Sequence, residues 1–325
     1  MAAVMVIYAH SYNLHSGHVR ERIQDFTGSE IGFGELAVLI FFAISGYLIT
    51  FSWMRDPHVK RFLERRLLRI VPALAVVTLF AAFIVGPWLT TLPLSEYFTN
   101  RLTWSYLLNV LVYPVHYHLP GVFADNPYPL AINGSIWTLR LEFSLYLVVM
   151  GLGLLGCLAW RWTGLLLSGL CLIAGVALNQ TVLEGIPFHK ELLLIALNGV
   201  PFFVGLFMAR NPGSEKASWP VIIGLGVGAV ILACVPHTDM LALPLVGYVT
   251  VTLAYALSMP MRGGDYSYGV YVWAFLVQQI VMHFEPHLKM IPFFFIATAV
   301  TFVFAALSWH FIEKPSLRHK PVTPR

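Results

Sequence analysis

Apolar stretches of about 20 residues recur along nearly the whole chain, with short polar turns between them. A helix rises 1.5 Å per residue, so roughly 20 such residues cross the hydrocarbon core of a bilayer. The pattern predicts ten membrane-spanning helices, near residues 1–14, 33–54, 70–90, 136–158, 162–180, 191–209, 218–236, 240–259, 266–284 and 291–312. One long connection, residues 91–135, separates the third span from the fourth.

The first apolar stretch is shorter than the others. Only nine residues precede His10, and no basic flank leads into the stretch. Either the first helix is short, or the sequence begins inside it. In both cases the pattern predicts an all-α, polytopic integral membrane bundle of about ten transmembrane helices that forms a single domain, residues 1–325.

Composition agrees with a membrane protein. Hydrophobic residues make up 58% of the chain and charged residues 11%, and the mean hydropathy is +0.74, which excludes an ordinary water-soluble domain. No aromatic-basic surface module is present, so we expect membrane lipid and no nucleic acid among the partners. His116 and His118 have the spacing of metal ligands, but no carboxylate or cysteine completes a set, and we expect no metal. The cysteines lie inside apolar runs and are expected to be core residues: Cys157, Cys171 and Cys234.

Lys and Arg residues are divided unequally between the two sides that ten spans define. Five fall in the odd-numbered turns: Arg20, Arg22, Arg101, Lys190 and Lys289. Fourteen fall in the even-numbered turns and the C-terminal tail: Arg55, Lys60, Arg61, Arg65, Arg66, Arg69, Arg161, Arg210, Lys216, Arg262, Lys314, Arg318, Lys320 and Arg325. Because cytoplasmic loops collect Lys and Arg, this asymmetry predicts that both termini are cytoplasmic.

Two titratable side chains at membrane depth are candidates for catalysis, because polar groups there are costly. His10 ends the run AAVMVIYAH, and an imidazole with an ordinary pKa near ~6.5 suits proton transfer at neutral pH. The alternative is an interfacial histidine at a helix end. Glu142 lies inside the fourth span, where a carboxylate needs a partner; Arg140 is two residues away on another helix face. The alternative for Glu142 is a structural ion pair with another helix.

The segment between the second and third spans holds the densest group of basic residues. Arg65 and Arg69 are four residues apart and share a helix face, with Arg66 beside them. Guanidinium groups bind phosphate oxygens in a bidentate manner, so these three arginines are candidates for binding a phosphorylated ligand. The alternative is a positive-inside anchor that touches anionic lipid. In the second span, Ser45 and Gly46 of FFAISGYLIT predict close helix packing.

Seven motifs in order resemble acyltransferase family 3, whose members O-acetylate bacterial surface polysaccharides and related glycans. They are His10 in the first helix, FFAISGYLIT (41–50), FLERRLLRIVP (62–72), LPGVF (119–123), NGSIWTLRLEFSLY (133–146), SYGVYVWAFLVQQ (267–279) and FIEKP (311–315). The resemblance covers most of the chain. It implies that His10 is the general base and that Arg65, Arg66 and Arg69 serve acyl-CoA on the cytoplasmic side.

The resemblance also implies that the Trp137–Glu142 segment lines the core. From these motifs we expect His10 and Glu142 to be catalytic, and Trp137, Thr138, Ser45 and Tyr268 to line the core or to contact substrate. Relatives usually carry a basic residue about ten positions before the histidine, which would fall before Met1. Many carry an Asp where this chain has Leu39, and a His where it has Ala274.

The function predicted in this way is a membrane-embedded O-acyltransferase of the bacterial inner membrane. It would move an acetyl group from cytoplasmic acetyl-CoA to a hydroxyl of a cell-surface or exported glycan, or of a lipid-linked saccharide. Many helices with buried polar groups also fit a transporter of an anionic lipid-linked sugar or metabolite. A structural membrane subunit is a third class, but it leaves the arginine face unexplained.

Overall fold

In the computed structural model, helices lie at all ten places where the hydrophobic pattern predicts spans. The structure describes residues 1–17, 20–179, 185, 187–257 and 264–321, and at Arg22 the backbone only. The ends of two predicted spans, at 180 and 258–259, and two of the counted basic residues, Arg262 and Arg325, lie outside the described residues.

The helices in chain order are α1 (Ala2–Ser16), α2 (Arg22–Thr27), α3 (Phe33–Arg55), α4 (Val59–Phe80), η1 (Ala81–Val85), α5 (Gly86–Leu89), α6 (Leu94–Thr99), α7 (Arg101–Tyr106), η2 (Leu107–Leu111), η3 (Gly134–Ile136), α8 (Trp137–Leu154), η4 (Cys157–Ala159), α9 (Thr163–Leu178), α10 (His189–Arg210), α11 (Trp219–Cys234), α12 (Asp239–Ala256), α13 (Ser267–Phe284), α14 (Met290–Ser308), η6 (Trp309–Glu313) and α15 (Lys314–Arg318). Within the described residues no strand forms, so the all-α prediction is confirmed.

Six of these helical segments are long and apolar enough to cross a bilayer, as judged from their length and composition among the described residues. They are Phe33–Arg55, Val59–Leu89, Gly134–Leu154, His189–Arg210, Asp239–Ala256 and Met290–Arg318. Two shorter apolar helices are Thr163–Leu178 and Trp219–Cys234. The membrane-protein prediction is thus supported, whereas the number of ten crossings stays a prediction. With 15 residues, α1 is about 22 Å long.

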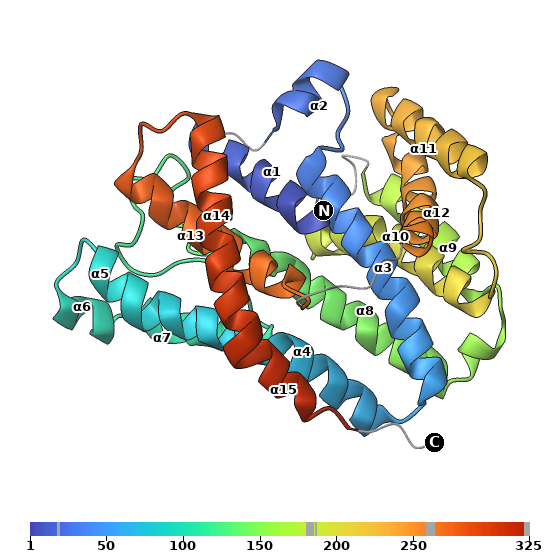
Figure 1. Ribbon diagram of the computed structural model, residues 1–325, viewed down its shortest axis with the longest axis horizontal. Helices are drawn as coiled ribbons and strands as arrows, with labels where there is room; N and C mark the ends of the chain where they lie inside the picture. The colour runs from blue at the N-terminus through green and yellow to red at the C-terminus, as the bar shows by residue number, and fades with distance from the viewer. Residues whose placement is uncertain (18–19, 180–184, 186, 258–263, 322–325) are drawn as a thin grey trace.

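The centre of the bundle is the crossing of α3 and α10, with α1, α8 and α12 packed around α3 (Figure 1). A Cβ atom built on Gly46 of α3 would lie 1.9 Å from the carbonyl oxygen of Phe202. A Cβ built on Gly205 of α10 would lie 2.2 Å from the carbonyl oxygen of Ala43. The two glycines therefore let the backbones touch, and the close packing predicted at Gly46 is confirmed.

Replacing Gly46 by Ala should lower the thermal unfolding temperature of the purified protein in detergent by several degrees. The added methyl group meets backbone, which cannot rotate away, and overpacking of this kind typically costs about 1–3 kcal/mol. The matched control is Gly151→Ala in α8, because a Cβ there has no atom within 4 Å. Equal unfolding temperatures for the two variants would show that α3 and α10 are not held together at Gly46.

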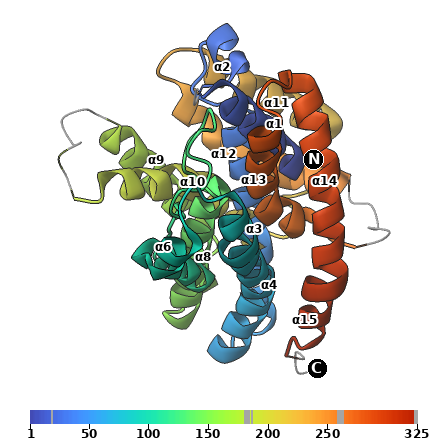
Figure 2. The ribbon, with the colours of Figure 1, turned by 90° about the vertical axis from the view of Figure 1, so that its left-hand side faces the viewer.

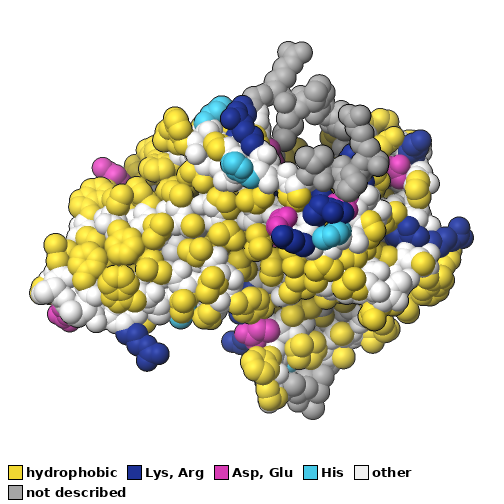
Figure 3. All heavy atoms as spheres, turned by 90° about the horizontal axis from the view of Figure 1, so that it is seen from below, with side chains coloured by type: hydrophobic (Ala, Val, Ile, Leu, Met, Phe, Trp, Pro, Cys, Tyr) yellow, Lys and Arg dark blue, Asp and Glu magenta, His cyan; other side chains and the backbone are white. Residues whose placement is uncertain are grey.

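Basic residues gather at one end of the bundle, called the basic end below: Met54–Arg69, Ala159–Arg161, Arg210–Lys216 and Lys314–Lys320. The guanidinium of Arg210 lies 3.1 Å from the carbonyl oxygen of Ala159 and 3.6 Å from Sδ of Met54, so three separate connections meet here. The C-terminal helices α14, η6 and α15 form one rod along the side of the molecule and end beside α4 (Figures 1 and 2). Figure 3 shows Lys and Arg side chains in the centre and right of the lower face, whereas the left is mostly hydrophobic.

The long connection predicted at 91–135 contains three short helices and then a segment without regular structure. Its last part is bound to α13, because the amide of Gln279 donates to the carbonyl oxygens of Tyr128 and Ala131 at 2.9 and 2.7 Å. Asn126 in turn donates to the side chain of Gln279 at 2.7 Å. These bonds fix the approach of the chain to α8 and thereby bring Tyr128 and Ser135 to the site described next.

Candidate active site

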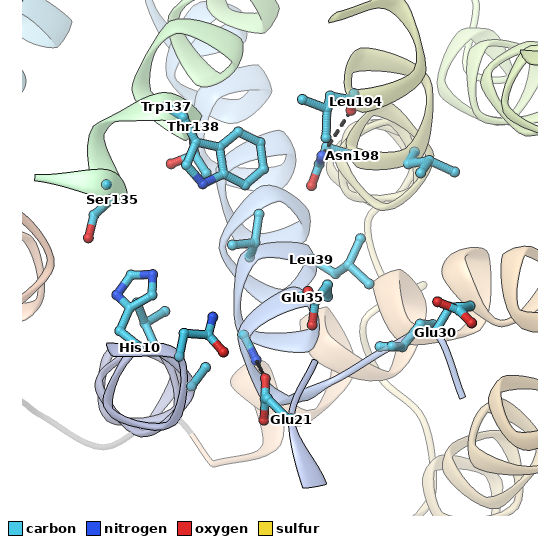
Figure 4. Close-up of a pocket in the computed structure, with 18 of the residues that line it drawn as sticks. His10, Glu21, Glu30, Glu35, Leu39, Ser135, Trp137, Thr138, Leu194 and Asn198 are labelled. Atoms are coloured by element: carbon cyan, nitrogen blue, oxygen red, sulfur yellow. Dashed lines mark hydrogen bonds between the residues drawn. The ribbon is translucent and has the colours of Figure 1, made fainter. Parts of the chain in front are cut away.

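A cavity of about 390 Å³ lies between α1, α3, the start of α8, α10, α12 and α13 (Figure 4). The polar residues that line it are Asn13 and His10 of α1, Glu21, Glu30, Glu35, Tyr128, Ser135, Thr138, Asn198, Asp239 and Tyr271. The indole of Trp137 also lines it. Three residues predicted from the sequence, His10, Trp137 and Thr138, therefore meet in one cavity, although they come from distant parts of the chain.

His10 is held in this cavity by aromatic packing. Its ring meets the ring of Phe275 edge-on, with centroids 5.1 Å apart. The Nδ1 atom is buried and has no hydrogen-bond partner within the described residues. A ring that is fixed in place while its nitrogen lacks a protein partner is available to a bound ligand.

Three hydroxyl groups line the same cavity as His10: those of Ser135 and Thr138 at the entry to α8 and that of Tyr271. Tyr271 of α13 is hydrogen-bonded to the hydroxyl of Thr138 and donates to the carbonyl oxygen of Ser135. Ser135 is 1% exposed, and its hydroxyl has no partner among the described residues. In Figure 4 this hydroxyl points toward His10. Neither Ser135 nor Tyr271 was assigned a role from the sequence.

Glu142 lies one turn further along α8 than Thr138 and does not line the cavity. It accepts a hydrogen bond of 2.7 Å from the hydroxyl of Ser45 and another from the hydroxyl of Tyr146. No Lys or Arg of the described residues lies within ion-pair distance of Glu142, so the structural ion pair considered above is not formed there. Arg140 instead reaches Glu191 at 3.7 Å, on another face of α8.

Ser135, Thr138, Glu142 and Tyr146 are spaced by three, four and four residues, which places them along one face of the helix. We call this set the polar stripe of α8. From Ser135 to Tyr146 it is about 16 Å long. Its far end meets Arg66 of α4, whose guanidinium lies 6.0 Å from the centre of the Tyr146 ring. The stripe therefore connects the basic end with the cavity of His10.

The three arginines predicted to bind phosphate have different partners. Arg65 is bonded to Asp56 at 2.8 Å, and Arg61 binds the same carboxylate at 2.6 and 2.9 Å. The hydrogen bond from Arg61 holds the pKa of Asp56 well below its usual range and outweighs the effect of burial; Arg65 adds to the lowering. Asp56 thus balances one of these two positive charges, and both guanidinium groups are held by its carboxylate.

Arg69 is likewise paired. It contacts Asp265 at 2.5 Å and lies 3.6 Å from Glu313, which the π-helical turn η6 buries. Burial raises the pKa of Asp265, but the charge of Arg69 and the hydrogen bonds from Ser267 outweigh it and lower the pKa overall. Tyr268 lies at this end of the molecule and not in the cavity: its ring packs 5.6 Å from the Arg69 guanidinium, and its hydroxyl donates to the carbonyl oxygen of Ile70 at 2.8 Å.

Arg66 alone of the three has no carboxylate within ion-pair distance in the described part of the chain. Its polar contact is the hydroxyl of Ser52 at 3.2 Å, and its Nε is buried without a partner. Partial burial lowers the pKa of Lys320, and the positive charges of Arg66, Arg69 and Arg65 lower it further. Arg66 is therefore the one of these three arginines whose charge no carboxylate of the described residues balances, although Arg65 also keeps two buried nitrogens without a partner.

Two positions where the chain departs from the pattern of the family that it resembles are apolar in the structure. Leu39 lines the cavity and packs against Val200 and Leu243. Ala274 is fully buried between Ile7 of α1 and Ala305 of α14. Within the described residues, no group of three His, Cys, Asp or Glu side chains could hold a metal ion.

The apolar helices define a membrane protein, and comparisons with known proteins define its class. Residues 1–310 match the family described as "Acyltransferase domain". The chain is 31% identical to an "O-acetyl transferase" of Shigella phage Sf6, over 97% of this chain and 92% of the relative. It is 26% identical to "Nodulation protein 10" of Rhizobium leguminosarum bv. viciae, over 98% and 91% respectively. No solved structure matches the chain.

The chain therefore belongs to acyltransferase family 3, and it is an acyltransferase. The sequence had left three classes open: an enzyme, a transporter and a structural membrane subunit. Membership in this family favours the enzyme over the other two.

Proposed function

We propose that the enzyme is an O-acetyltransferase that moves an acetyl group from acetyl-CoA to a hydroxyl of a cell-surface or exported glycan. The observation that carries the proposal is the polar stripe of α8, which runs from Arg66 to the cavity that holds His10. A phosphate-binding group and a candidate base thus lie at opposite ends of one polar path. The name of the relative from phage Sf6 supports acetyl as the transferred group.

The donor would bind at the basic end. Arg66 has unused donor capacity and would hold phosphate oxygens of acetyl-CoA. The uncharged arm of CoA would then follow the polar stripe and bring the thioester toward His10. Glu142 is kept in place by Ser45 and Tyr146, so it would orient this arm or balance the charge of Arg66.

The acceptor would bind in the cavity. His10 would remove the proton of an acceptor hydroxyl, and the oxygen would attack the thioester carbonyl carbon. The new oxygen–carbon bond forms while the carbon–sulfur bond breaks, and the thiolate of CoA leaves with the electron pair. The proton on His10 then returns to the thiolate or to water. Placing both reactants in one site accounts for a large part of the expected rate enhancement.

The proposed orientation in the membrane follows from the separation of the donor site at the basic end from the acceptor site in the cavity of His10. We propose that the enzyme lies in the bacterial inner membrane with the basic end in the cytoplasm, where acetyl-CoA is available. The C-terminal helix α15 lies at this end, and the N-terminus of α1 is proposed to face the same side. The cavity of His10 would then open toward the outside, where an exported glycan is found.

Acetyl-CoA turnover in sealed membrane vesicles tests donor and orientation together. Inverted vesicles expose the basic end, so added acetyl-CoA should release CoA and leave base-labile acetyl groups on vesicle glycan. Right-side-out vesicles should become active only after detergent is added. Turnover in right-side-out vesicles alone would reverse the orientation. Absence of turnover in both preparations, with and without detergent, would contradict the O-acetyltransferase.

A further inference from the structure

The cavity that holds His10 is lined by four carboxyl side chains, and no Lys or Arg of the described residues lines it. The four are Glu21, Glu30, Glu35 and Asp239. Figure 4 shows Glu21, Glu30 and Glu35 on the side of the cavity opposite Trp137 and Thr138. The charge of this cavity is thus opposite to the charge of the basic end.

Main-chain hydrogen bonds hold two of these carboxyl groups in place. Glu21 accepts hydrogen bonds from the N–H groups of Phe33 and Gly34 at 3.2 and 2.9 Å. Glu35 accepts from the N–H of Gly32 at 3.0 Å. Burial raises the pKa of Glu21, against these hydrogen bonds, and the charge of Glu35 adds to the increase. Glu21 and Glu35 are therefore anchored at the entrance to α3. Together with Glu30 and with Asp239 at the start of α12, they are called the acidic wall below.

Arg20 compensates the acidic wall only at its rim. Its guanidinium binds Glu30 at 3.0 Å, and both side chains are about half exposed or more. Solvent weakens such an exposed pair. The carboxyl groups of Glu21, Glu35 and Asp239 have no Lys or Arg of the described residues within ion-pair distance.

A second observation points to a ligand rich in hydroxyl groups. Ser135 presents a buried hydroxyl that has no partner in the described residues and points toward His10 (Figure 4). A buried hydroxyl group without a hydrogen-bond partner costs free energy, and a bound ligand can supply the missing hydrogen bond. Asn198 uses its amide nitrogen on the carbonyl oxygen of Leu194 at 2.9 Å, so its oxygen is available on the cavity wall. Trp137 adds a flat apolar surface of the kind on which a ring packs.

We infer that this cavity selects an acceptor sugar that carries no negative charge near the reacting hydroxyl. Neutral sugars can form hydrogen bonds through their hydroxyl groups with Ser135, Asn198 and the carboxylates. A uronate or a phosphate would instead be repelled by the negative charge of the cavity, and the apolar walls would screen this repulsion only weakly. The inference rests on the proposed function and names the class of acceptor. The same field excludes the phosphates of CoA, which leaves the basic end as the entrance for the donor.

Charged thiol reagents test the field without knowledge of the acceptor. In a background in which Cys157, Cys171 and Cys234 are replaced by Ala, Leu194→Cys places a thiol on the cavity wall. The probes are 2-(trimethylammonium)ethyl and 2-sulfonatoethyl methanethiosulfonate, and each rate is divided by its rate with a free thiol in solution. The cationic reagent should react at least about tenfold faster than the anionic one after this correction.

The matched control is Ser52→Cys in the same background, beside Arg66, where the order should reverse in favour of the anionic reagent. Adding Glu35→Gln and Asp239→Asn to Leu194→Cys should lower the corrected ratio, because each amide keeps its oxygen and loses its charge, while Glu21 and Glu30 remain. Equal corrected rates in Leu194→Cys, or no reaction with either reagent, would overturn the inference even if the enzyme transfers acetyl groups.

A matched pair of acceptors gives the second test. The purified enzyme is offered a neutral methyl glycoside and the corresponding methyl glycoside uronate, which differ in one carboxylate. Acetylation of the neutral sugar should be faster by about tenfold or more, and Glu35→Gln with Asp239→Asn should narrow the difference. A preference for the uronate would overturn the inference. Acetyl-CoA that is not consumed under any condition would contradict the proposed function instead, while the reagent test would still decide the charge of the cavity.

Discussion

Replacing His10 by Gln should reduce acetyl transfer at least about 100-fold while the protein remains folded in the membrane. Gln has a similar size and still forms hydrogen bonds, but it cannot take a proton, and loss of a general base typically costs about 10²–10⁴ in rate. The ring of His10 lies in the cavity with a buried nitrogen that has no protein partner in the described chain, which is the state expected of a base awaiting its substrate. The measurement is CoA release from acetyl-CoA by equal amounts of purified protein.

The matched control for this variant is His15→Gln on the same helix. His15 does not line the cavity, and its Nε2 lies 2.9 Å from the carbonyl oxygen of Leu288, a contact that a Gln amide can replace. This variant should keep nearly all activity, which separates loss of the base from disturbance of α1. Near-normal turnover in a well-folded His10→Gln protein would remove His10 from the mechanism.

Hydrophobic periodicity was sufficient for the class of fold and for the position of every predicted helix. It could not give the number of membrane crossings, because length and composition are the same for a helix buried in protein and one that faces lipid. Residues 81–85 and 309–313 show a further limit, since both are π-helical. The widened turn at the second place buries Glu313 near Arg69, and nothing in the local sequence specifies that contact.

The spacing of residues in the sequence indicates more residues of the site than we predicted from it. Ser135 and Tyr146 complete a helical spacing with Thr138 and Glu142, and this signal is present in the amino-acid sequence alone. In contrast, the pairing of Arg65 with Asp56 and of Arg69 with Asp265 depends on tertiary contacts, one of them nearly 200 residues apart in the chain. The acidic wall also has no local signature, because its carboxyl groups come from separate segments that the fold brings together.

Replacing Arg66 by Gln should raise the KM for acetyl-CoA about 10- to 100-fold, with a smaller effect on the rate at saturating donor. The reason is the loss of one charge-assisted contact, which is worth about 1.5–3 kcal/mol. Arg66→Lys should also weaken binding, because an ammonium keeps the charge and loses the bidentate geometry. Sequence spacing favoured Arg65 and Arg69, which share a helix face, and placed Arg66 only beside them. The contacts favour Arg66, because the other two are already bound to carboxylates.

Arg65→Lys and Arg69→Lys are the controls in the same helix. Each should keep its ion pair with Asp56 or Asp265 and change the KM less than Arg66→Lys does. If the basic end were only a positive-inside anchor, all three Lys variants would match the parent enzyme, because that signal depends on charge and not on shape. Saturation kinetics in detergent, where the topology is already set, distinguish the two cases. A parental KM in both Arg66→Gln and Arg66→Lys would place the donor phosphates elsewhere, whereas a larger effect at Arg65 or Arg69 would mean that acetyl-CoA displaces a carboxylate from its arginine when it binds.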